Sequence, residues 1–174
     1  MKNAGQTTRT VAALAVSAAL LFGFQVAKAA FMPFLPNVEV VSLLVMLFTV
    51  TFRHKVLFII YIFVLLEGIY YGFGLWWVTY LYVWTILALV TWLCRSFDSL
   101  WIMAAVAGVF GLLFGAMDAI PYIFISGFPS ALARWISGIP FDLVHCAGNV
   151  VLCLALWIPL RRVLTRCVKT LRLS

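Results

Sequence analysis

A few polar side chains interrupt long apolar runs in this chain, and their types and spacing resemble those of a ligand-binding site. Asp142, His145 and Asn149 follow one another at i, i+3 and i+7, so they share one face of a helix. Glu67 lies inside another apolar run, with nothing local to neutralise it. An ionised carboxylate at the bilayer centre costs at least about 2.5–3.5 kcal/mol, so such groups normally face a bundle interior or a cavity. We therefore expect these four residues to contact a substrate.

Aromatic residues crowd the segment that follows Gly74. One face of it carries Trp77, Tyr80 and Trp84, and we expect Trp77 and Tyr80 to form an aromatic wall of the binding site. An aromatic belt at the membrane interface is the alternative interpretation. The apolar, proline-stiffened loop at residues 32–36 is a candidate lid over such a pocket.

The polar residues near the C-terminal span also have structural interpretations. Asp142 would cap a helix that starts after Pro140, and Asn149 would hydrogen-bond a neighbouring helix. A metal site made of Asp142, His145 and Cys146 lacks a matching second pair of ligands, so we expect no metal and no cofactor.

Three more charged residues fall in or near apolar runs. Glu39 follows Asn37, which predicts that Asn37 caps a helix and that Glu39 lies in its first turn, where the helix dipole favours an acid. Asp118 either binds a ligand or pairs with Arg134. Arg134 would reach Glu67 only through the fold.

The composition places these residues in a membrane protein. Of the 174 residues, 66% are hydrophobic and 10% are charged, against roughly 45–50% and about 25% in ordinary globular chains. A soluble fold of this size could not bury that much apolar surface. Soluble enzymes and nucleic-acid-binding modules are therefore excluded as classes, despite the net charge of +7.

The hydropathy pattern predicts an all-α integral membrane protein with six transmembrane helices in one domain, residues 1–174. A helix needs roughly 20 apolar residues to cross the hydrocarbon core. The second span is short, and Gly138 and Pro140 leave open a break in the sixth that would start the true span at Pro140. The spans cover residues 11–31, 38–52, 56–73, 76–93, 100–124 and 131–160.

The basic residues predict how these helices cross the membrane. Ten of the twelve Lys and Arg lie before the first span or after the second, fourth and sixth, whereas only Lys28 and Arg134 lie in the alternate connections. The positive-inside rule then places both termini in the cytoplasm, with a basic tail from about residue 161 that attracts anionic lipid. Residues 27–29 imitate a signal-peptidase site, but we expect the first helix to be retained, because its apolar run is long.

Three stretches give the chain a family resemblance. Residues 135–149, WISGIPFDLVHCAGN, resemble the last helix of the substrate-binding S components of energy-coupling factor (ECF) transporters. Residues 35–41, LPNVEVV, and residues 65–68, LLEG, with the YGFG that ends at Gly74, are similar to early helices of that family. The likeness spans nearly the whole chain.

The resemblance implies a small subunit of the bacterial cytoplasmic membrane that binds a vitamin or related micronutrient from outside. Its pocket would lie near the outer side, under the loop after the first helix. A membrane scaffold subunit and two cytoplasmic ATPases would drive transport by reorienting the whole subunit. Ala15 and Ala19, small residues on the first helix, would contact the scaffold. The resemblance leaves the particular substrate open.

Two rival functions come from other classes. One is a structural membrane protein similar to the rod-shape-determining family, which is also small, basic and six-spanning; the polar stripe of the last helix disfavours it. The other is an intramembrane enzyme with Asp142 and His145 as acid–base groups. The chain has no GxSxG, HExxH, P-loop or Rossmann motif, so we expect no enzyme.

The predicted topology can be tested with reporter fusions. A reporter placed after Lys55 and one placed after Ser174 should both report the cytoplasm, because both points follow basic segments that the positive-inside rule retains there. An external C-terminus would contradict the count of spans or the retention of the first helix.

Overall fold

The computed structural model describes residues 4–32, 38–97 and 99–171, and this part of the chain is helical without a strand. The α-helices are α1 (Ala4–Phe31), α2 (Val41–Phe52), α3 (Val56–Tyr71), α4 (Leu75–Cys94), α5 (Leu100–Ser126) and α6 (Phe128–Leu171). Two short 3-10 turns also occur, η1 (Arg53–Lys55) between α2 and α3 and η2 (Arg95–Phe97) after α4.

The described residues contain five helical segments that are long and apolar enough to cross a membrane, when α2, η1 and α3 count as one. Large apolar side chains such as Phe58, Ile69 and Leu89 are exposed on the outside of the bundle. A lipid environment would solvate them, whereas water would not. The chain is therefore a helical membrane protein.

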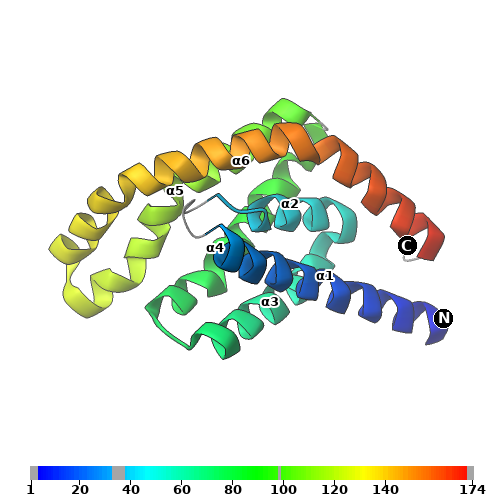
Figure 1. Ribbon diagram of the computed structural model, residues 1–174, viewed down its shortest axis with the longest axis horizontal. Coiled ribbons are helices and arrows are strands. Elements are labelled where there is room, and N and C mark those ends of the chain that lie inside the picture. Colours follow the sequence, from blue (N-terminus) through cyan, green and yellow to red (C-terminus); the bar gives the residue numbers. More distant parts are fainter. Residues whose placement is uncertain (1–3, 33–37, 98, 172–174) are drawn as a thin grey trace.

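Figure 1 shows that α1 begins and α6 ends at the same end of the molecule. The third, fourth and fifth predicted spans differ from α3, α4 and α5 by no more than two residues at either end. The six crossings and the placement of both termini in the cytoplasm remain predictions.

The shortest helix, α2, lies at the centre of the bundle and contacts α1, α3, α4 and α6. Its buried residues run without interruption over positions 41–49, as expected for a helix that is apolar all round. With 12 residues it is about 18 Å long, less than the roughly 30 Å of a hydrocarbon core. The predicted second span, residues 38–52, therefore corresponds to a central helix that begins three residues later, and its crossing of the membrane remains a prediction.

The longest helix, α6, continues for 44 residues through Pro140 and Pro159. The break considered at Gly138 and Pro140 does not occur, although α6 curves visibly along its length in Figure 1. Because α6 starts at Phe128, Asp142 lies more than three turns inside it. The interpretation of Asp142 as a helix cap is therefore wrong.

Three glycines on α5 let α6 pack against it at very short range. Gly108, Gly111 and Gly115 recur three and four residues apart, so they share one face of α5. A Cβ atom at Gly111 would lie 2.8 Å from the backbone nitrogen of Cys146, and one at Gly115 would collide with the carboxylate of Asp142. Small residues at such spacing allow two helix backbones to approach closely in lipid.

The close packing of α5 on α6 can be tested with Gly111→Val. The added side chain has to displace the α6 backbone, so we expect the free energy of unfolding to fall by about 1–3 kcal/mol, seen as a lower thermal midpoint in detergent. Gly23→Ala is the matched control, because a Cβ at Gly23 meets no atom within 4 Å among the described residues. A Gly111→Val protein as stable as this control would contradict the packing.

Candidate functional site

A cavity of about 510 Å³ opens between the first turns of α4, the second half of α5 and the first third of α6. Its wall combines four aromatic rings with three charged side chains and two glycines. The lining consists of Trp76, Tyr80, Phe114, Gly115, Asp118, Arg134, Ser137, Gly138, Phe141 and Asp142.

Two of the charged groups in the wall neutralise each other. Arg134 donates from Nε and Nη2 to Oδ2 of Asp118, at 2.9 and 2.7 Å. The guanidinium also lies 4.2 Å from the ring centroid of Tyr122, within cation–π range. The predicted alternative that Asp118 pairs with Arg134 is confirmed, and Arg134 therefore does not serve as the counter-ion of Glu67.

The third charged group, Asp142, is 97% buried in the cavity wall. Its Oδ1 accepts a hydrogen bond of 2.9 Å from the backbone N–H of Gly115 on α5. Its Oδ2 has no hydrogen-bond partner in the described part of the chain. Buried polar atoms are usually paired, and an unpaired one costs about 1–3 kcal/mol, so this oxygen is an acceptor that lacks a donor.

The other two members of the predicted polar stripe lie deeper between α5 and α6. Asn149 donates from Nδ2 to the backbone carbonyl of Ala107 at 3.1 Å, which confirms the interpretation that it hydrogen-bonds a neighbouring helix. His145 packs edge-on against Phe114, with ring centroids 5.1 Å apart. Asp142 is thus the one member of this stripe that lines the described cavity wall.

His145 also lies near the carboxylate of Glu39, which precedes the first residue of α2. Its Nε2 lies 3.5 Å from Oε1 of Glu39, within ion-pair range but without hydrogen-bond geometry. Glu39 accepts from the backbone N–H groups of Val41 and Ser42, at 2.9 and 3.3 Å, and from the Ser42 hydroxyl at 2.7 Å. The expected role of Glu39 at a helix start is confirmed, although it precedes α2 rather than lying in its first turn. The predicted cap, Asn37, lies outside the described residues.

The remaining predicted site residues are divided between the cavity and the core. Tyr80 lines the cavity, and its ring contacts those of Trp76 and Trp84, each with centroids 5.3 Å apart. Trp77 donates from Nε1 to the carbonyl of Val64 at 2.8 Å, which joins α4 to α3. Glu67 is almost fully buried on α3, and its Oε1 has no partner among the described residues.

The structure therefore brings two of the six predicted ligand residues, Tyr80 and Asp142, to one cavity. Ligand contacts by Glu67, Trp77, His145 and Asn149 remain predictions. The candidate lid at residues 32–36 falls almost entirely outside the described residues.

Sequence reasoning named Asp118 of α5 and Arg134, Gly138 and Asp142 of α6, but it missed the other residues with which these two helices line the cavity. Phe114, Gly115, Ser137 and Phe141 line the wall without standing out in composition or motif. The glycine spacing on α5 was the signal that could have found this side, because it predicts close contact with another helix.

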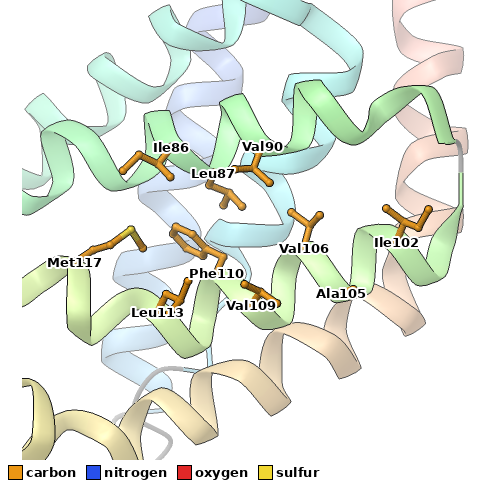
Figure 2. A pocket seen from close by; sticks show the side chains of 10 residues that line it. All are labelled: Ile86, Leu87, Val90, Ile102, Ala105, Val106, Val109, Phe110, Leu113 and Met117. Atoms are coloured by element: carbon orange, nitrogen blue, oxygen red, sulfur yellow. The ribbon is translucent and has the colours of Figure 1, made fainter.

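A second hollow lies between α4 and α5, with a volume of about 320 Å³. Figure 2 shows side chains from both helices pointing into it, including Leu87 and Val90 from α4 and Val109 and Leu113 from α5. All the residues that line it are apolar, so it offers no group for chemistry and suits lipid chains.

A proline in α5 leaves one backbone carbonyl of that helix free to bond with the neighbouring helix α4. Pro121 has no N–H, so the helix leaves the carbonyl of Met117 without its usual donor. The hydroxyl of Tyr82 on α4 donates to that carbonyl at 2.6 Å. This bond fixes α4 against α5 beside the cavity, since Met117 neighbours Asp118 in the chain.

Comparisons with known proteins find no match to a protein-family model, a curated protein or a solved structure.

The link between Pro121 and Tyr82 can be tested with a double-mutant cycle. We expect Tyr82→Phe to lower the free energy of unfolding by about 1–3 kcal/mol, because it leaves the Met117 carbonyl without a donor. In a Pro121→Ala background the restored N–H can bond that carbonyl, so the same substitution should cost less. Thermal unfolding in detergent measures all four proteins, and equal losses in both backgrounds would contradict the link.

Proposed function

We propose that this protein is the membrane-embedded substrate-binding subunit of an ECF-type importer. It captures a vitamin or related micronutrient from outside and delivers it with a separate scaffold subunit and two ATPases. The observation that carries the proposal is the cavity between α4, α5 and α6, with its aromatic walls and its unpaired Asp142 oxygen. The resemblance of residues 135–149 to S components supports it, because that stretch includes Ser137, Gly138, Phe141 and Asp142 of the cavity wall.

The cavity has the size and composition of a small-molecule site. Ligand pockets commonly measure about 300–1,000 Å³ and combine apolar walls with a few placed polar groups. Here the rings of Trp76, Tyr80, Phe114 and Phe141 provide the apolar surface, and Asp142 provides a polar anchor. The site can therefore hold a small organic molecule of the size of a micronutrient.

The same features disfavour a purely structural role. A protein that only holds a shape gains stability when a cavity is filled and a buried acceptor is paired or replaced. Here an unpaired carboxylate oxygen lies beside a hollow of about 510 Å³. A ligand that donates to Asp142 would remove both penalties at once.

The outer face of α1 supports the expected contact with a scaffold. Ala15 and Ala19 are exposed on α1, whereas Leu14, Ala18 and Leu21 are buried against the bundle. Gly23, one turn after Ala19, is exposed on the same outer face. A second membrane helix could therefore approach closely along this side of α1.

Ligand binding is tested with the detergent-purified protein. Native mass spectrometry should detect a co-purified small molecule, and its affinity should fall about tenfold to a hundredfold in Asp142→Asn, which removes the charge and keeps the shape. Leu113→Ala is the control, because it changes the apolar hollow between α4 and α5 instead. Unchanged affinity in a folded Asp142→Asn protein would contradict the assignment of the cavity.

Coupling to a scaffold is tested at the exposed face of α1. Ala15→Trp and Ala19→Trp should abolish uptake in cells while ligand binding to the purified protein stays unchanged, because the bulky rings block helix approach without touching the cavity. Val151→Trp, at another exposed position, is the control that should leave uptake intact. Normal uptake by the double Trp variant would contradict the assigned interface.

A further inference from the structure

We infer that the cavity selects a planar organic cation, such as a protonated nitrogen heterocycle or an aromatic amidinium, over an anion of the same shape. The inference rests on the proposed binding function, and it names the chemical class of the ligand.

The first argument is the charge of the wall. Among the described residues that line the cavity, the charged side chains are Asp118, Arg134 and Asp142. Arg134 is held by two hydrogen bonds to Asp118, so these two charges compensate each other. Asp142 accepts a hydrogen bond from the backbone N–H of Gly115, and no cationic side chain of the described cavity lining pairs with it.

The second argument is the surroundings of Tyr80. This residue lies in the cavity wall, and the carboxylates of Glu39, Glu67 and Asp118 are all close enough to interact with it electrostatically. Glu39 accepts hydrogen bonds at the start of α2 and Asp118 pairs with Arg134, whereas Oε1 of the buried Glu67 has no partner among the described residues. Of these acids, Glu67 is therefore the one that, when ionised, would favour a positive charge near Tyr80.

The third argument is the aromatic surface. Four rings line the cavity, and the faces of such rings attract cations and repel anions through their quadrupole. Trp76 and Tyr80 meet edge to face, with an angle of 89° between their planes. The protein already uses this attraction nearby, where the guanidinium of Arg134 lies over Tyr122.

The fourth argument is hydrogen-bond demand. Oδ2 of Asp142 lacks a donor among the described residues, and an N–H group on a cation supplies one with charge assistance. An anionic ligand finds no such match. Beside Arg134 it would also meet the carboxylate of Asp118, which already compensates the guanidinium through two hydrogen bonds.

The test uses three probes that share the naphthalene ring system and differ in charge. They are naphthamidinium, naphthamide and naphthoate, each substituted at the same carbon. Calorimetric titration is done on the full chain in nanodiscs of zwitterionic lipid, so that the membrane does not sort the probes by charge. We expect affinity to fall in the order amidinium, amide, naphthoate, with about tenfold or more between the first and the last. Equal affinities, the reverse order or no binding would overturn the inference.

Two variants locate the selectivity. Asp142→Asn keeps an acceptor for the Gly115 N–H, and it should remove most of the preference for the amidinium over the amide. Asp118→Asn releases Arg134 and should raise the affinity for naphthoate, whereas Leu113→Ala should change none of the three. If a variant does not fold, the affinities of the three probes for the unmodified protein still decide the inference.

Failure of this inference can be told apart from failure of the proposed function. If mass spectrometry finds an anionic micronutrient bound, or if naphthoate binds best, the charge selection is wrong while the binding function stands. If the probes follow the expected order but no micronutrient co-purifies and uptake does not depend on the protein, the charge selection stands and the proposed function fails.

Discussion

The close contact of α5 with α6 at Gly111 and Gly115 is the constraint on which the described site depends. Gly111 lets the α6 backbone reach van der Waals distance of α5, and Gly115 leaves the space that the Asp142 carboxylate occupies. The same approach brings the Gly115 N–H within 2.9 Å of Asp142 and the Ala107 carbonyl within 3.1 Å of Asn149. A side chain at either glycine would move the acid away from the cavity wall, so packing and site chemistry share one interface.

A second polar arrangement joins the site to the centre of the bundle. The central helix α2 begins inside the protein, where its first N–H groups need acceptors that water would otherwise supply. Glu39 accepts from two of them and from Ser42, and His145 of α6 lies at ion-pair distance from the same carboxylate. The start of α2 is thereby tied to the helix that carries Asp142.

Hydropathy and charge patterns predicted most helices of the fold because lipid imposes them locally. Apolar runs set the extents of α3, α4 and α5 to within two residues. The patterns failed where long-range packing decides. A proline such as Pro140 normally ends a helix, but α6 runs through it while packed along α5.

The site was predicted only in part for the same reason. Residue type and spacing singled out Asp142 and Tyr80, which do line the cavity, and suggested the Asp118–Arg134 pair. Residue type and spacing could not show that Asn149 donates to the Ala107 carbonyl or that Trp77 donates to the Val64 carbonyl, because those acceptors lie on other helices. A backbone acceptor carries no signature in a sequence, so the division between packing and binding residues required the fold.

The described cavity contains an ion pair, Asp118 with Arg134, and a separate acid, Asp142, that has no cationic partner in the lining. This difference determines which kind of ligand the site prefers. Arg134 and Asp118 remain partly exposed, with 45% and 19% of their side chains accessible. Asp142 is 97% buried, and its field is weakly screened. Burial of this carboxylate without a second donor destabilises the empty protein. A ligand removes that free-energy cost only if it brings a hydrogen-bond donor or a positive charge to Asp142, and the same burial therefore makes the site selective between ligands.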